Sequence, residues 1–126
     1  MKLHLARAAG RNLFSGYGAG YVAINGERFE HSLIVLPDRV AEWEIQRFEQ
    51  LVPSAFESLA GLPIDVLVLG TGDRLRFPSP AHLQPLTHAG IGVEVMDTQA
   101  ACRTYNVLLS EDRRVAAALL VVRDGA

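Results

Sequence analysis

GIGVEVMDTQAACRTYNVLLSEDRRVAAALL, residues 90–120, contains three secondary-structure signals in immediate succession. Apolar side chains alternate within Ile91–Val95, and this period of two predicts a strand. Asp97 or Thr98 then supplies the oxygen-bearing side chain that helix N-termini favour. The residues after this cap repeat their apolar members at helical spacing, so a strand is predicted to lead directly into a helix.

The predicted helix has one apolar side and one polar side. Its apolar positions are Ala101, Cys102, Tyr105, Leu108 and Leu109, and its polar positions are Gln99, Arg103, Asn106 and Ser110. Val115–Val122 follows as an almost wholly apolar segment, which predicts a second strand. Its three consecutive alanines, at 116–118, would let a helix approach the sheet closely.

The same alternation of strand and helix extends upstream. Ile64–Leu69 is apolar and rich in β-branched residues, as in a strand covered on both faces. Ser79 and Pro80 form a helix start, with the serine as cap and the proline in the first turn, and Gly90 ends this helix. From Ile64 onward the order is β-α-β-α-β, which favours parallel strands joined by right-handed helical crossovers.

The N-terminal half contains a hairpin signal. Asn25-Gly26 lies between Tyr21–Ile24 and Glu27–Leu36, and these two residues supply the positive φ angles of a type I′ turn. Val40–Ile45 is interpreted as a further short strand, and helical spacing predicts a regular helix over residues 53–60. We expect the hairpin to extend the parallel strands into one mixed sheet.

The composition limits the class of protein. The 126 residues are 49% hydrophobic and 21% charged, which fits one α/β domain spanning residues 1–126. A formal net charge of -2 gives no general attraction to phosphate backbones, so nucleic acid is not expected as a partner. Val115–Val122 is much shorter than the ~20 apolar residues of a membrane-spanning helix. Because the N-terminus also lacks the apolar core of a secretory signal, we expect a cytoplasmic protein.

Two loops predict where a ligand would bind. If the strands ending near Leu69 and Met96 are parallel neighbours, their ends meet at one edge of the sheet, where α/β proteins commonly bind ligands. The residues brought together there are Gly70, Thr71, Gly72, Asp97 and Thr98, and Tyr105 would point its hydroxyl toward the same edge. Threonine hydroxyls and glycine N–H groups suit an anion or a polarised carbonyl.

The same residues also have purely structural explanations. Gly70–Gly72 can end a strand without binding anything, and Asp97 or Thr98 can cap a helix. A buried tyrosine such as Tyr105 usually packs its ring and bonds its hydroxyl to a carbonyl. Both interpretations stay open at this point.

Other chemistry-bearing groups are sparse. Cys102 is the sole cysteine and lies on the apolar side of the predicted helix, so a buried and inert thiol is expected. His82 and His88 would fall on opposite sides of a helix, and neither His4 nor His31 adds a metal-ligand spacing. We therefore expect no metal and no cofactor, and no residue is assigned a catalytic role.

Five motifs are distributed over nearly the whole chain. They are the Asn25-Gly26 hairpin, GTG at 70–72 with Phe77-Pro78, GIGVEVMDT at 90–98, TYN at 104–106 and RRVAAAL at 113–119. Together they resemble a family of small, mostly uncharacterised α/β proteins that includes a mitochondrial assembly factor for respiratory complex I. The resemblance implies a three-layer α/β/α fold with a mixed sheet and a hairpin extension. It brings no cofactor and no catalytic residues, and it suggests a bacterial cytoplasmic relative.

Two functions from different classes follow from these observations. The first is a non-enzymatic protein-interaction or assembly-factor-like protein, acting on a protein partner or as a homodimer. Its apolar surface would lie near Tyr17 and Tyr21 of the hairpin or at Trp43. The alternative is a small-molecule-binding protein or enzyme that uses the Gly70–Gly72 and Asp97–Thr98 loops. An exposed apolar patch would favour the first, and an open concavity between the loops the second.

Overall fold

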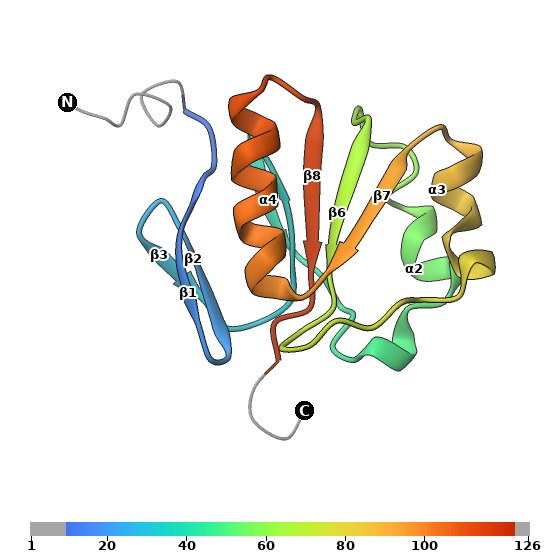
Figure 1. Cartoon of the computed structure of the whole chain (residues 1–126), viewed down its shortest axis with the longest axis horizontal. Helices are drawn as coiled ribbons and strands as arrows, with labels where there is room; N and C mark the ends of the chain where they lie inside the picture. Colours follow the sequence, from blue (N-terminus) through green and yellow to red (C-terminus); the bar gives the residue numbers. More distant parts are fainter. Residues whose placement is uncertain (1–9, 123–126) are drawn as a thin grey trace.

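The computed structural model describes residues 10–122, so His4 and most of the segment considered for a secretory signal lie outside the described residues. Figure 1 shows a central sheet with helices on both of its faces. In chain order the elements are β1 (Phe14–Gly18), β2 (Tyr21–Ile24), β3 (Glu27–Phe29), β4 (Leu33–Leu36), β5 (Arg39–Glu42), η1 (Phe48–Gln50), α2 (Pro53–Glu57), β6 (Val66–Gly70), η2 (Pro80–Leu83), α3 (Gln84–His88), β7 (Gly92–Met96), α4 (Thr98–Ser110) and β8 (Val115–Leu119).

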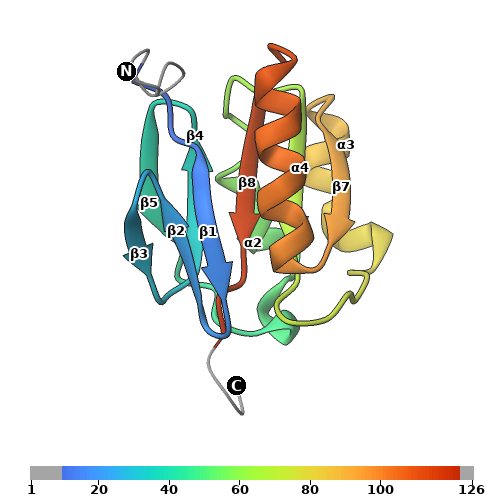
Figure 2. The same ribbon diagram turned by 60° about the vertical axis from the view of Figure 1, so that its left-hand side comes forward.

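The strands form two sheets. The larger one has the order β5-β4-β8-β6-β7 and is mixed, because β8 pairs in parallel with β6 and antiparallel with β4. The smaller sheet has the order β1-β2-β3 and is antiparallel throughout. Figure 2 shows it beside α4, in front of β4 and β5.

Alternation along the strands supplies two apolar layers, one on each face of the larger sheet. One layer contains Val66, Val68, Val115, Ala117 and Leu119 and packs with α4 and the smaller sheet. The other contains Leu67, Leu69, Ala116 and Ala118 and packs with α2 and α3. The alanines of β8 therefore face both layers, and the three-layer α/β/α arrangement with a mixed sheet is confirmed.

The expected β-α-β-α-β order is confirmed in the C-terminal half. β6 pairs in parallel with β7, with Leu69 opposite Val95 and Gly70 opposite Met96. The two strands therefore end side by side at one edge of the sheet, which we call the carboxyl edge. This was the geometric condition for bringing the two predicted loops together.

The N-terminal half differs from the expectation in its pairing. Asn25 and Gly26 have positive φ values of 49° and 89° and form the expected turn between β2 and β3. The predicted strand Glu27–Leu36 is wrong as a single strand, because its first part pairs in the smaller sheet and its last part in the larger one. The hairpin thus belongs to a separate sheet, and β1, which was not expected, forms an edge of that sheet.

The predicted helices are shorter or divided. The helix expected after Ser79 is split into η2 and α3, because Pro85 lacks an N–H and lies in the first turn of the second segment. Ser79 does accept the N–H of Ala81, as a cap should. α2 ends at Glu57, short of the expected residue 60.

The smaller sheet is attached to α4 by side chains on the helix. The Asn106 amide accepts the N–H of Phe14 at 3.0 Å and donates to the Phe14 carbonyl at 2.8 Å. It thereby replaces the strand that β1 lacks on its free edge. The Tyr105 ring meets the Phe14 ring edge to face at 5.2 Å, which adds an apolar contact at the same place.

Substitution of Gly70 tests how tightly the carboxyl edge is packed. A Cβ at this position would lie 2.9 Å from both the Leu119 Cδ2 and the Thr98 Cα. Gly70→Ala is therefore expected to lower the free energy of unfolding by about 1–3 kcal/mol in urea denaturation. Gly61→Ala is the matched control, since a Cβ there meets nothing within 4 Å. Equal stability of the two variants would contradict this packing.

Candidate carboxyl-edge site

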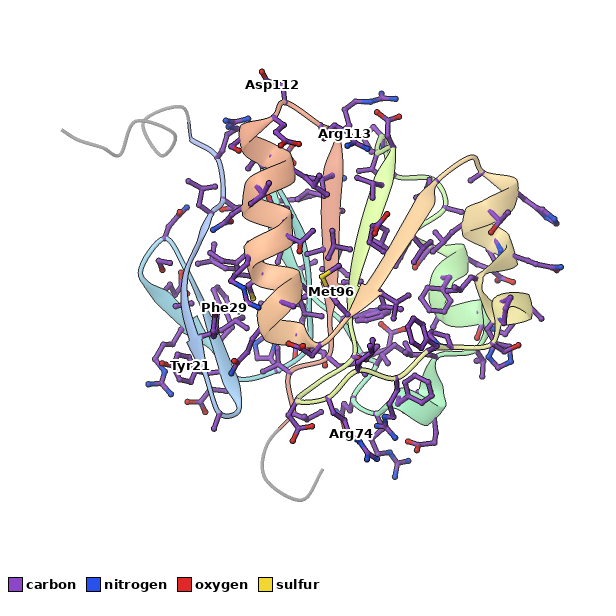
Figure 3. All side chains as sticks on the ribbon, in the orientation of Figure 1. Tyr21, Phe29, Arg74, Met96, Asp112 and Arg113 are labelled. Atoms are coloured by element: carbon purple, nitrogen blue, oxygen red, sulfur yellow. The ribbon has the colours of Figure 1, made fainter. Side chains whose placement is uncertain are left out.

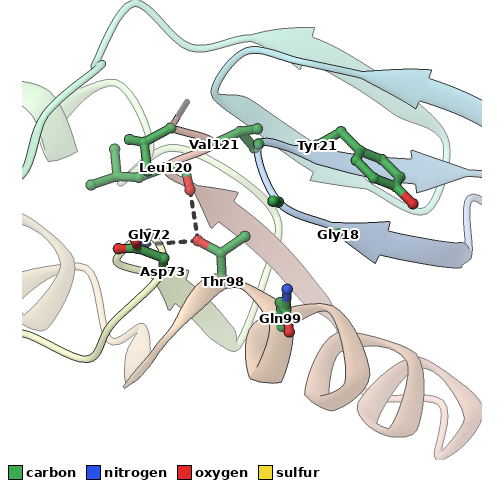
Figure 4. Close-up of a pocket in the computed structure, with 11 residues that line it drawn as sticks. Gly18, Tyr21, Gly72, Asp73, Thr98, Gln99, Leu120 and Val121 are labelled. Carbon is green, nitrogen blue, oxygen red and sulfur yellow. Dashed lines mark hydrogen bonds between the residues drawn. The ribbon is translucent and has the colours of Figure 1, made fainter. Parts of the chain in front are cut away.

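The Thr98 hydroxyl connects the ends of three strands. It accepts the N–H of Gly72, just after β6, at 2.9 Å and donates to the Leu120 carbonyl, just after β8, at 2.6 Å (Figure 4). The backbone N–H of Thr98, just after β7, donates to the Gly72 carbonyl at 2.8 Å. Because Thr98 is only 7% exposed, these bonds are shielded from water. The hydroxyl that was predicted to face a ligand is thus bound within the protein.

Thr71 organises the loop that follows β6. Its hydroxyl lies 2.8 Å from the Arg74 carbonyl oxygen and 3.2 Å from the Met96 carbonyl oxygen, and it accepts the N–H of Arg76 at 3.1 Å. The side chain is 2% exposed. Thr71 therefore shapes residues 72–76 from inside the loop.

Asp97 has the capping role that the sequence suggested. Its Oδ1 accepts the N–H of Ala100 at 2.9 Å, so Asp97 is the N-cap of α4 and Thr98 is the first helical residue. Gly72 has a φ of 98°, in the region that favours glycine, which explains a glycine at this turn.

The two predicted loops meet and leave little space between them. A hollow of about 60 Å³ lies beside Gly72 and Thr98, bounded on its other side by Gly18 and Tyr21 of the hairpin (Figure 4). Ligand sites for metabolites usually enclose roughly 300–1,000 Å³, whereas this hollow has room for about two water molecules. Binding of a small molecule by Gly70, Thr71, Gly72, Asp97, Thr98 and Tyr105 stays a prediction, and a ligand larger than this hollow would require the loops to separate.

Tyr105 and Cys102 lie within the core rather than in the hollow. The Tyr105 hydroxyl donates to the Asn12 carbonyl at 3.2 Å, and burial raises the pKa of this phenol. Burial also raises the pKa of the Cys102 thiol to about 12. Both groups are therefore neutral near pH 7, and the packing role considered for Tyr105 is the one the contacts support.

The residues expected to form an exposed apolar surface are buried or half-buried in the structure. Trp43 is only 5% exposed and packs against Phe56, so the expectation of an exposed Trp43 is wrong. Tyr21 is half-buried and covered by the Arg28 guanidinium, 3.7 Å from the ring centroid. The half-buried Tyr17 accepts a hydrogen bond from Arg103 at 2.6 Å.

Sequence reasoning missed the loop from Asp73 to Phe77, which reads DRLRF. Leu75 is 48% and Phe77 is 70% exposed, and Arg74 and Arg76 are among the lining residues of a hollow. Figure 3 shows Arg74 at the lower margin of the molecule, where the strand arrows end. The alternation of arginine and apolar side chains after GTG is the signal that would have identified this loop.

Neither a metal cluster nor a membrane span is found in the part of the chain that the structure describes. Within residues 10–122 there is no group of three or more histidine, cysteine, aspartate or glutamate side chains arranged to hold a metal ion. Over the same residues no helix is both long and apolar enough to cross a bilayer.

The fold and its closed carboxyl edge define a small α/β domain in which the buried hydroxyls of Thr71 and Thr98 hydrogen-bond to the backbone. Comparison with known proteins then gives the family. The chain belongs to the DUF498/DUF598 family, described as proteins of unknown function, whose profile matches residues 14–120.

Relatives and solved structures agree with this assignment. The chain is 34% identical to the bovine (Bos taurus) NADH dehydrogenase [ubiquinone] 1 alpha subcomplex assembly factor 3, over 82% of this chain and 58% of that protein. It therefore spans less than two thirds of that relative. It is 38% identical to an uncharacterised protein of Rhodobacter capsulatus, over 89% of this chain and 86% of the relative. A crystal structure of a Bordetella parapertussis protein has 44% identity and a TM-score of 0.83, covering 88% of this chain and 96% of that one.

Removal of the Thr98 hydroxyl tests its structural role. Thr98→Val keeps the side-chain shape but leaves the Gly72 N–H and the Leu120 carbonyl without their partner. The free energy of unfolding is expected to fall by about 2–4 kcal/mol in urea denaturation. The control is Thr87→Val on the exposed part of α3, expected to change stability by less than about 0.5 kcal/mol. If Thr98→Val lowers the free energy of unfolding no more than Thr87→Val does, the Thr98 hydroxyl is dispensable for stability.

Thiol chemistry tests the environment of Cys102. With a pKa of about 12, roughly one thiol in ten thousand is ionised at pH 8, and the sulfur is buried. We expect native protein to react with iodoacetamide only on the timescale of unfolding, while protein in urea is labelled rapidly. Mass spectrometry measures the labelled fraction. Rapid labelling of the native protein would contradict an inert thiol.

Proposed function

We propose that this protein is a non-enzymatic, assembly-factor-like protein of the cytoplasm that acts by binding another protein. The proposal draws on the name of the bovine relative, an assembly factor for NADH dehydrogenase, with which the chain shares 34% identity. It also draws on the carboxyl edge, where the threonine hydroxyls are occupied by backbone groups instead of being available for catalysis.

The observation that carries the proposal is the exposure of Phe77. A phenylalanine that is 70% exposed, two residues from a leucine that is 48% exposed, leaves apolar area in water. Burying that area against a partner would be favourable, at about 25 cal/mol per Å². Aromatic side chains of this kind are also enriched at the centres of protein interfaces. We therefore place the contact surface on Leu75 and Phe77.

Affinity capture with matched variants tests this surface. Phe77→Asp introduces a charge where apolar contact is proposed, and we expect the captured partner to fall at least about tenfold relative to the unaltered chain. Val107→Asp is the control, because Val107 is 53% exposed on α4, away from the loop. Quantitative mass spectrometry of material captured from the native host measures the ratio.

Light scattering of the purified variants addresses the case in which the partner is a second copy. If Leu75 and Phe77 form a homodimer contact, Phe77→Asp lowers the molar mass in solution and Val107→Asp does not. The proposal fails if every partner is retained and the molar mass is unchanged in Phe77→Asp.

A further inference from the structure

We propose that Arg47, Arg74 and Arg76 form a binding pocket for a small multivalent anion, of the phosphate-ester or pyrophosphate class. This site is distinct from the apolar contact of Leu75 and Phe77, although both use the same loop. It also differs from the predicted site between the two loops, since of those residues only Thr71 lines it.

The pocket is a hollow of about 450 Å³ at the carboxyl edge of the sheet. Its arginines come from two separate segments, Arg47 from the residue preceding η1 and the other two from the loop after β6. Carboxyl edges of parallel strands are where α/β domains commonly bind ligands, and this volume is within the usual range for a small molecule. The hollow beside Gly72 and Thr98 is much smaller, at about 60 Å³.

Thr71 gives the pocket a fixed wall. Its buried hydroxyl bonds to the Arg74 carbonyl and to the Arg76 N–H, so the backbone of both arginine positions is held from within. The loop bends at residues 72–74, and its side chains differ in what they contact. Arg74 and Arg76 line the hollow, whereas Leu75 and Phe77 do not and are exposed.

Arg76 is positioned by neighbours that leave its charge incompletely balanced. Its guanidinium lies over the Phe48 ring, 4.6 Å from the centroid, which orients the planar group. The Glu49 carboxylate is 3.7 Å away and largely exposed, so this ion pair is weak. The Arg76 Nε is buried and has no hydrogen-bond partner among the described residues. This guanidinium therefore has donor capacity that an anion could use after a small rearrangement.

The charges around the hollow favour an anion, and the number of arginines favours one with several oxygens. Three arginines are among its lining residues, against the two acidic residues Glu49 and Asp73, which leaves a net positive lining. Guanidinium groups stay protonated at every physiological pH and bind phosphate oxygens in a two-pronged manner. A ligand with several oxygens can engage more than one arginine at once, whereas a carboxylate uses both of its oxygens in one two-pronged contact.

Titration with inorganic pyrophosphate, followed by NMR of the backbone amides, tests the pocket. We expect saturable shifts confined to residues near 47–49 and 71–76, and none of comparable size with acetate at the same ionic strength. Arg76→Gln and Arg74→Gln should each weaken the affinity roughly tenfold or more. Arg39→Gln, on the exposed edge strand β5, is the control and should leave the affinity unchanged.

The outcomes separate this inference from the proposed function. Localised, saturable shifts that depend on Arg74 and Arg76 support the pocket, including in Phe77→Asp, where protein capture is expected to be lost. The result for Arg76→Gln counts as an effect on binding only if this variant keeps the amide spectrum of the folded protein. If it does not, Arg74→Gln tests the pocket instead. Absence of saturation at millimolar pyrophosphate, or an equal loss in Arg39→Gln, overturns the inference.

Discussion

One buried hydroxyl, that of Thr98, sets the geometry of the carboxyl edge. It bonds to backbone groups beyond the ends of β6 and β8 while its own backbone follows β7. Three strands brought together by parallel pairing must each turn away from the sheet, and without this hydroxyl the Gly72 N–H and the Leu120 carbonyl would each lose a partner. Thr98 supplies those partners from a buried position, since it is only 7% exposed. Gly70 accommodates this approach because a side chain there would collide with Thr98 and Leu119.

These hydrogen bonds close the carboxyl edge. The binding surfaces that we propose therefore lie on the loop after β6, outside the sheet. Thr71 is used in the same way as Thr98, since its hydroxyl bonds to the loop after β6 instead of to a ligand. The loop it stabilises bends at residues 72–74 and then continues without regular secondary structure to Ser79. Arg74 and Arg76 line a hollow, and Leu75 and Phe77 are exposed and are not among its lining residues. The loop therefore carries both arginine and apolar side chains within four residues, 74–77.

The N-terminal sheet adds a second example of a side chain completing the backbone hydrogen bonding. Asn106 pairs with both backbone groups of Phe14 and so ties the smaller sheet to α4. Tyr105 and Phe14 fill the space beneath this contact. The TYN motif at 104–106 is therefore accounted for by the attachment of the smaller sheet, with Tyr105 and Asn106 both in structural roles.

Local patterns were sufficient for the order of strands and helices in the C-terminal half of the fold, although the helix expected after Ser79 is divided in two. The period of two in β7, the Asp97 cap and the amphipathic α4 depend on neighbouring residues, so the sequence alone predicts them and the order β-α-β-α-β. Pairing partners depend on distant residues, and for this reason the division of Glu27–Leu36 between two sheets and the existence of β1 required the tertiary structure.

The same holds for the site. Thr71 and Thr98 were identified by position, but whether their hydroxyls face a ligand or a carbonyl is decided by how closely the loops pack. The convergence of Arg47 with Arg74 and Arg76 likewise appears only when the chain folds, because nothing local joins segments so far apart.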